Sequence, residues 1–184
     1  MHRKPLLNLL ARYNATEQLD DRARDRIAAF VEANADCFER SLLQGHVTGS
    51  AWIVDPSRSQ CLLTHHRKLE RWLQLGGHAD GQADILEVAM REAREESGLA
   101  SLVPVATEIF DCDVHSIPAR KTEPQHWHYD VRFLLEADPD EALVISEESK
   151  ELAWVPLAGV EALSGDASVV RMVAKTAMFS TARS

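Results

Sequence analysis

One stretch of the sequence joins a glycine turn to a segment rich in carboxylates: Gly76-Gly77-His78-Ala79-Asp80-Gly81-Gln82-Ala83-Asp84-Ile85-Leu86-Glu87-Val88-Ala89-Met90-Arg91-Glu92-Ala93-Arg94-Glu95-Glu96-Ser97-Gly98-Leu99. Asp84 is a favourable N-cap residue, and Glu87 three positions later completes a capping box. Apolar residues recur on one face, and Gly98 suits the left-handed conformation that ends many helices. The pattern predicts an amphipathic helix between Asp84 and Gly98.

Three carboxylates of this helix are spaced so that they share one face. Glu92, Glu95 and Glu96 stand at positions i, i+3 and i+4, within about one turn of each other. One interpretation is a solvated acidic surface, the usual explanation of an isolated run of charges. The other is a site for Mg²⁺ or Mn²⁺, because hard divalent cations bind carboxylate oxygens together with substrate phosphates.

The stretch resembles the Nudix box, G-x5-E-x7-R-E-U-x-E-E-x-G-U, in which U is an apolar residue. Gly77 occupies the first position, and residues 91–99 match the end of the box at the expected distance, with the small Ala93 at one apolar position. Ala83 stands where the family has its first glutamate, which supports the catalytic helix and its arginine. Asp80 and Asp84 are the candidates to replace that glutamate.

The resemblance implies an α/β fold, a Nudix-like α/β/α sandwich with a mixed β-sheet. We expect a Nudix domain over residues 44–179 and an N-terminal helical extension over residues 1–43, which could also serve as a partner-binding or dimerising arm. Periodicity and turn residues predict the following elements: helices at 5–13, 16–34, 160–163 and 169–178, and strands at 47–55, 61–66, 102–105, 108–115, 125–135, 143–145 and 152–157.

The resemblance also implies a hydrolase of nucleoside diphosphates linked to another moiety, a pyrophosphatase that uses Mg²⁺ or Mn²⁺. Glu92 and Glu96 are the expected principal metal ligands, and Glu95 is a further ligand or a contact to the metal's water. Arg91 would orient the glutamates. Glu148, in a late acidic loop, is the first candidate for the general base or an extra ligand.

Substrate contacts are expected from three further places in the chain. Gly77 would shape the loop that lets the helix begin close to the phosphates, and Arg67 and Lys68 could attract phosphate or belong to a basic surface loop. On the strand at 125–135, the side chains of His126, His128, Asp130 and Arg132 alternate with an apolar face. That polar face either meets solvent or lines a cleft. A transition-metal site at its two histidines is ranked lower, because no cysteine lies nearby.

Composition limits the partners that the chain could have. With 20 basic and 29 acidic residues the net charge is −9, which argues against a general binder of nucleic acid or anionic membranes. No stretch is apolar for long enough to span a bilayer. The three separated cysteines, Cys37, Cys61 and Cys112, favour a reducing cytoplasm over a disulfide framework. The expected partner is a nucleotide-type small molecule, and a homodimer is an assembly that the resemblance allows.

Two other functions stay open. Because Ala83 departs from the box, the chain could be a catalytically weak Nudix-like module that binds a nucleotide or a protein partner. An isomerase acting on a prenyl diphosphate is the third interpretation, and it would need Cys61 or Cys112 as a catalytic cysteine.

Overall fold

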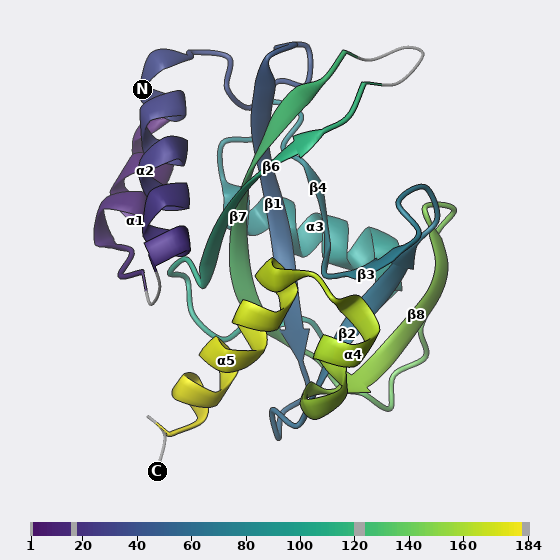
Figure 1. The fold of residues 1–184 in the computed structure, drawn as a ribbon. Helices are drawn as coiled ribbons and strands as arrows, with labels where there is room; N and C mark the ends of the chain where they lie inside the picture. Colours follow the sequence, from purple (N-terminus) through teal and green to yellow (C-terminus); the bar gives the residue numbers. More distant parts are fainter. Residues whose placement is uncertain (1, 16–17, 120–123, 182–184) are drawn as a thin grey trace. The chain divides into compact units, whose positions relative to one another are not determined.

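The computed structural model describes residues 2–15, 18–119 and 124–181 (Figure 1). The helices and strands follow in the order α1 (Lys4–Arg12), α2 (Gln18–Ala33), β1 (Gly45–Val54), β2 (Gln60–His66), β3 (Arg71–Leu73), β4 (Leu75–His78), α3 (Ile85–Ser97), β5 (Val103–Pro104), β6 (Asp111–Ile117), β7 (His126–Glu136), β8 (Ser149–Pro156), the 3₁₀ turn Leu157–Gly159, α4 (Val160–Ser164) and α5 (Ala167–Thr181). No helix of the described residues is long and apolar enough to cross a membrane.

The chain forms two compact units. The first comprises Met1–Ser50, Gly76–Ala89 and Thr107–Phe133, and the second comprises Ala51–Leu75, Met90–Ala106 and Leu134–Ser184. Each of β1, α3 and β7 begins in the first unit and ends in the second.

The strands pair in the order β3-β2-β1-β7-β5, with β4 beside β1, β6 beside β7 and β8 beside β2. The β1–β2, β2–β3, β2–β8, β5–β7 and β6–β7 pairs are antiparallel. In the first unit the Trp127 N–H donates to the Gln44 carbonyl, and in the second the Ala137 N–H donates to the Val54 carbonyl. The donor and acceptor residues are separated by the same number of positions in both bonds, which is the pattern expected when β1 and β7 run parallel. The sheet is therefore mixed, as predicted.

In the first unit, α2 lies beside β6, and α1 lies against α2 (Figure 1). Tyr13, after α1, donates its hydroxyl to Asp20 of α2 and also to the Phe110 carbonyl. Asp20 is fully buried and also accepts the Cys112 N–H, at 3.3 Å. Burial, with the Asp20 hydrogen bond, raises the pKa of Tyr13. These bonds attach the N-terminal helices to the sheet.

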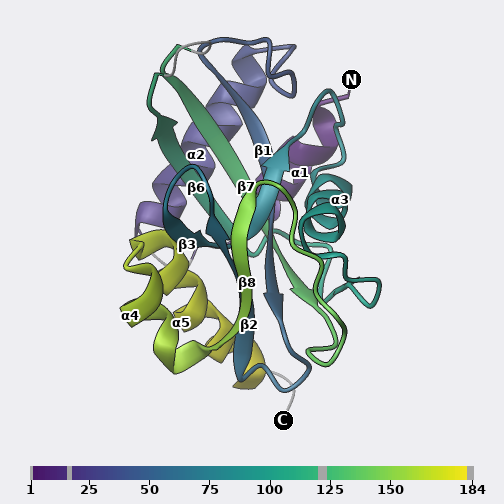
Figure 2. The same cartoon turned by 90° about the vertical axis from the view of Figure 1, so that its right-hand side faces the viewer.

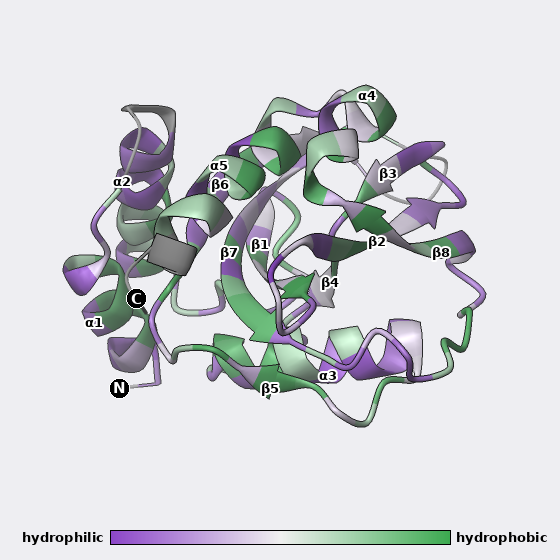
Figure 3. Cartoon of the chain, turned by 90° about the horizontal axis from the view of Figure 1, so that it is seen from below, coloured by the Kyte–Doolittle hydropathy of each residue, from purple (hydrophilic) through white to green (hydrophobic). Residues whose placement is uncertain are grey.

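In the second unit, α4 and α5 lie side by side, and α4 also contacts β3 (Figure 2). Ser164 at the end of α4 donates to the Trp72 carbonyl at 2.7 Å. The fully buried Trp52 of β1 donates its indole N–H to Thr176 of α5 at 2.8 Å. The C-terminal part of β7 is mostly hydrophobic (Figure 3), and Leu134 and Leu135 belong to the core.

Helix α3 begins and ends as its sequence predicts. The Glu87 N–H donates to the Asp84 carboxylate at 3.3 Å, which is an N-cap bond. Gly98 has a φ of +74°, and its N–H donates to the Arg94 carbonyl at 2.8 Å. A Cβ at Gly98 would lie 2.7 Å from Val144 Cβ, so two independent reasons favour glycine there.

One predicted strand is wrong, and others have different bounds. Residues 143–145 form an irregular loop, because the Val144 N–H donates to the Ser97 carbonyl at 2.7 Å instead of to a neighbouring strand. β5 has only two residues, and β6 begins at Asp111. Strands β3 and β4 are too short to show the alternating pattern from which a strand can be predicted. Residues 16–17 of the predicted 16–34 helix lie outside the described part of the chain.

Gly76 has the most demanding backbone position before the carboxylate helix. Its φ is +154°, and an added Cβ would lie 2.6 Å from Ser50 Cα. We expect Gly76→Ala to lower the free energy of unfolding by about 1–3 kcal/mol, through backbone strain and this contact. Urea unfolding measures the loss. The control is Gly165→Ala, which has φ +62° but nothing within 4 Å of the added Cβ; an equal loss in both variants would show that the Ser50 contact contributes nothing.

Candidate functional site

The carboxylates of α3 that face one way differ in their exposure. Glu96 is only 8% exposed, and the Glu92 side chain is 15% exposed, whereas the Glu95 side chain is 61% exposed. Glu92 and Glu96 are therefore recessed, and Glu95 reaches into solvent. Two sheltered carboxylates next to an exposed one differ from a uniformly solvated acidic face.

Arg91 lies against two of these glutamates. Its Nη1 is 2.6 Å from Glu92 Oε1 and 3.4 Å from Glu95 Oε2. A guanidinium at these distances reduces the repulsion between neighbouring carboxylates and limits their rotamers. Arg91 therefore contacts the glutamates that it is predicted to orient.

The acidic loop that carries Glu148 is attached to the C-terminal end of α3. Beyond the Val144 bond to Ser97, the Glu141 carboxylate accepts the N–H groups of Ala100 and Ser101, at 2.7 and 3.0 Å. Hydrogen bonds from Ser101 and from these N–H groups lower the pKa of Glu141. The loop is therefore anchored at the helix end that carries Glu96.

Arg67 holds the other end of the same loop. Its backbone N–H donates to the Glu148 carbonyl at 2.8 Å, and its guanidinium donates to the carbonyls of Glu147 and Ser149, at 2.9 and 2.8 Å. These bonds make Arg67 a positioning residue for the loop. Lys68 and Glu148 are both exposed, so their side chains can meet a substrate from solvent.

Gly77 and the two aspartates named as replacements for the missing glutamate lie in the first unit. Gly77 belongs to β4, whereas the special backbone conformation is that of its neighbour Gly76. Asp80 forms an ion pair with Arg40, and Asp84 caps α3. Both aspartates therefore have roles of their own.

Arg132, expected on a substrate-facing surface, lies in the interior of the first unit. Its side chain is 2% exposed and pairs with Asp130, Asp111 and Asp113 at 2.7, 3.2 and 3.4 Å. Asp130 also accepts the hydroxyls of Thr48 and Ser50, at 2.9 and 2.8 Å.

Burial lowers the pKa of Arg132, but the three aspartates outweigh burial, so the net shift is upward. These ion pairs favour a structural role over substrate contact. At Arg132 the polar face of β7 is thus neither simply solvated nor an open cleft, because Arg132 pairs with carboxylates of β6 and β7.

His126 and His128 meet two histidines that the sequence analysis did not connect with them. The ring centroids of His46 and His78 lie 4.9 and 5.1 Å from that of His128, and His46 lies 5.1 Å from His126. Burial, with His78 and His126, lowers the pKa of His46 to about 4. Burial, with His115 and His78, lowers the pKa of His128 to about 2. We call His46, His78, His126 and His128 the histidine cluster.

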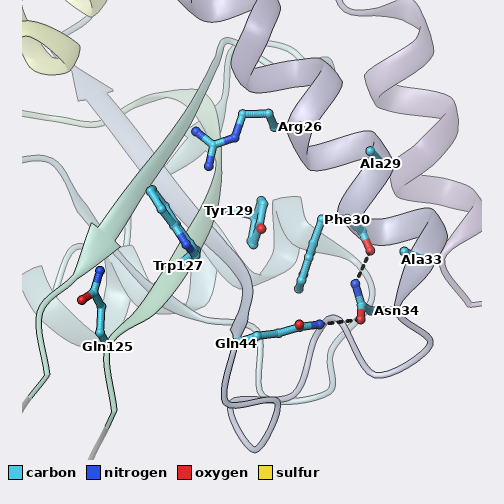
Figure 4. A pocket seen from close by; sticks show the side chains of 9 residues that line it. All are labelled: Arg26, Ala29, Phe30, Ala33, Asn34, Gln44, Gln125, Trp127 and Tyr129. Atoms are coloured by element: carbon cyan, nitrogen blue, oxygen red, sulfur yellow. Dashed lines mark hydrogen bonds between the residues drawn. The ribbon is translucent and has the colours of Figure 1, made fainter.

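The first unit also has an open pocket between α2 and β7 (Figure 4). Phe30 stacks on Tyr129 with ring centroids 3.8 Å apart, and Arg26 lies over Trp127 at 4.8 Å. Trp127 is 37% exposed, whereas Trp52 is in the core and cannot contact a ligand. A planar ligand would find its stacking surface in this pocket.

The cysteines offer no accessible nucleophile. Cys37, Cys61 and Cys112 are all buried. Burial raises the pKa of Cys37 to about 11 and that of Cys61 to about 12, which keeps both as thiols at neutral pH. These environments argue against the isomerase interpretation.

The donor set on α3 suits a hard divalent cation. Glu92, Glu95 and Glu96 supply only oxygen atoms, and Glu148 lies in the loop anchored at the end of that helix. Mg²⁺ and Mn²⁺ prefer such ligands. In ligand type these residues suit the metal that the sequence resemblance implies, but among the described residues the only group of three or more donors that lie close enough together to share an ion is His46, His78 and His128.

Comparisons with known proteins found a family model and solved structures that resemble this chain. A NUDIX domain model matches residues 46–175. A C. elegans Ap4A hydrolase structure is similar with a TM-score of 0.60 and 16% identity, covering 74% of this chain and 98% of that one. A NUDIX-family hydrolase from Clostridium perfringens has a TM-score of 0.54 and 23% identity, covering 73% and 97%.

The NUDIX domain of Shewanella oneidensis NrtR, complexed with ADP ribose, has a TM-score of 0.53 and 15% identity, covering 82% of this chain and 97% of that one. At these identities the structures show a shared fold. No curated protein matched in a sequence comparison. Because the domain model covers most of the sequence and the fold agrees, the chain belongs to the Nudix family.

Proposed function

We propose that the protein is a metal-dependent hydrolase of the diphosphate bond in a nucleoside diphosphate linked to another moiety, acting in the cytoplasm. Family membership supports an enzyme of the Nudix type. The observation that carries the proposal is the pair of recessed carboxylates, Glu92 and Glu96, with Arg91 against Glu92. On a solvated acidic face, Glu92 and Glu96 would be exposed to solvent as Glu95 is.

The proposed roles follow from charge and position. A bound Mg²⁺ or Mn²⁺ would neutralise phosphate charge and lower the pKa of a water molecule. Glu92 and Glu96 would hold the cation, and Glu95 would contact it directly or through water. Arg91 keeps the carboxylates oriented, and Glu148 accepts the proton from the attacking water.

For phosphate binding we propose Lys68, an exposed residue within the connection between β2 and β3. Arg67 acts indirectly, through the loop of Glu148. Gly77 places the beginning of the box, with Gly76 providing the tight approach to Ser50. His126 and His128 lie in the histidine cluster. Their rings are partly buried, so a substrate would have to enter the cluster to contact them.

The test is a panel of nucleoside triphosphates, dinucleoside polyphosphates, ADP-ribose and sugar nucleotides, assayed for release of phosphate and nucleotide. The neighbours' titles name Ap4A and ADP ribose, which makes these two compounds the first to try. We expect turnover with Mg²⁺ or Mn²⁺ and none with chelator. Nucleotide binding without turnover, with either metal, would favour the binding module suggested by Ala83.

A further inference from the structure

The histidine cluster brings together residues from three strands of the first unit. His46 comes from β1, His78 from β4, and His126 and His128 from β7. Donor nitrogens of His46, His78 and His128 all lie within 4.8 Å of one another. This chain has eight histidines, so half of them gather at one place.

His46 is the least explained member of the cluster. It is 4% exposed, yet neither its Nδ1 nor its Nε2 has a hydrogen bond of good geometry, although the Leu42 backbone lies near enough to favour its protonated form. A buried imidazole without a well-formed hydrogen bond destabilises the fold. A ligand that accepts a lone pair from His46 would remove this cost.

His126 is arranged as a metal-binding imidazole is. Its Nδ1 lies 3.0 Å from the Pro124 carbonyl, which can only accept a hydrogen bond, so Nδ1 carries the proton. Its Nε2 then carries the lone pair, which faces Nε2 of His128 at 3.3 Å. Histidine ligands usually donate their second N–H to a carbonyl or carboxylate in this way.

The cluster also has room for a small ion and water. A cavity of about 50 Å³ is lined by His46, His78 and His126 of the cluster, whereas His128 is not part of its wall. Arg40 lies at its wall, but this guanidinium is paired with Asp80. The cationic neighbour is therefore already balanced by a carboxylate.

From this geometry we propose a second metal site, separate in its ligands from the carboxylates of α3, in which His46, His78 and His128 bind a divalent transition metal such as Zn²⁺. His126 supplies the fourth ligand. Imidazole nitrogens suit Zn²⁺, Cu²⁺, Ni²⁺ and Fe²⁺, whereas Mg²⁺ prefers oxygen. All-nitrogen ligands therefore select a different cation from that of the Nudix box.

The side chains need only a small movement to bind zinc. Tetrahedral Zn–N bonds of about 2.0–2.1 Å place donor atoms about 3.3 Å apart. The nitrogens of His126 and His128 already have this separation. Those of His46, His78 and His128, within 4.8 Å, would approach by at most about 1.5 Å, which rotation about side-chain bonds can supply.

The experiment uses the full chain without a histidine tag, stripped with chelator and kept in ~5 mM Mg²⁺ to fill the carboxylate site. Zn²⁺ is titrated against a chromophoric chelator. We expect one equivalent to bind with a Kd below about 1 µM. At a hundredfold excess over Kd, the Tm should rise by about 5–10 °C.

Variants assign the site. His46→Asn, His78→Asn and His128→Asn should each weaken Zn²⁺ binding by at least about 10–100-fold. His2→Asn is the control, because His2 lies outside the cluster and contacts the Ala35 carbonyl. Glu96→Gln should keep zinc binding, which separates this site from the proposed catalytic one.

Three results would overturn the proposal: no binding up to ~100 µM Zn²⁺, equal affinity in the cluster variants and wild type, or loss of binding in Glu96→Gln. Any of them would leave the His126–His128 contact as a hydrogen bond between imidazoles. The wild-type Tm shift needs no variant, so a cluster variant that fails to fold does not prevent the test.

Discussion

Replacing Glu96 by Gln is expected to lower kcat by about 10³-fold, which corresponds to about 4 kcal/mol of transition-state stabilisation. The amide keeps the size of the side chain but removes the charge that would hold the cation. Glu96 is 8% exposed, so water cannot readily replace the lost ligand. The measurement is steady-state hydrolysis of the best substrate across a range of Mg²⁺ concentrations.

Two variants on the same helix make this result specific. Glu87→Gln, exposed near the start of α3, should leave kcat within a factor of about two, as surface substitutions usually do. Glu95→Gln should have an intermediate effect, because its side chain is 61% exposed and water can take its place. If Glu96→Gln kept wild-type kcat and folded normally, Glu96 would not hold the catalytic metal.

Helix α3 could be predicted from local sequence because its determinants are local. Asp84, the apolar periodicity and Gly98 act within a few residues of each other, and the structure confirms both ends of the helix. The β1–β2 hairpin could be predicted for the same reason. Residues 143–145 were mistaken for a strand because their apolar composition is strand-like, whereas their partner is the end of α3.

The carboxylates of the candidate site could be named from the sequence, but their surroundings could not. Spacing placed Glu92, Glu95 and Glu96 on one face, yet their different burial depends on distant packing. The histidine cluster depends on strands β1, β4 and β7 meeting, so His46 and His78 carried no signal of their own. The alternation of the strand at 125–135 placed Arg132 on a polar face, but two of its ion-pair partners, Asp111 and Asp113, come from the neighbouring strand β6.

Arg132→Met is expected to lower the free energy of unfolding by about 3–5 kcal/mol, the largest stability effect that we predict. The substitution preserves much of the side-chain volume but leaves Asp111 and Asp130, which are 0% and 2% exposed, without their cation. A buried charge that loses its partner retains its desolvation cost, whereas Coulomb attraction no longer offsets it. Urea or thermal unfolding measures the loss.

Arg12→Met is the matched control, because Arg12 and its partner Glu108 are both more than half exposed at 3.4 Å, and exposed pairs contribute at most about 1 kcal/mol. Adding Asp130→Asn to Arg132→Met should recover part of the lost stability, because one of the stranded charges is removed. Thr48 and Ser50 can still donate to the amide oxygen of the new side chain. If Arg132→Met and Arg12→Met cost the same, burial would not strengthen the Arg132 ion pairs, and Arg132 would again be open to a role in substrate binding.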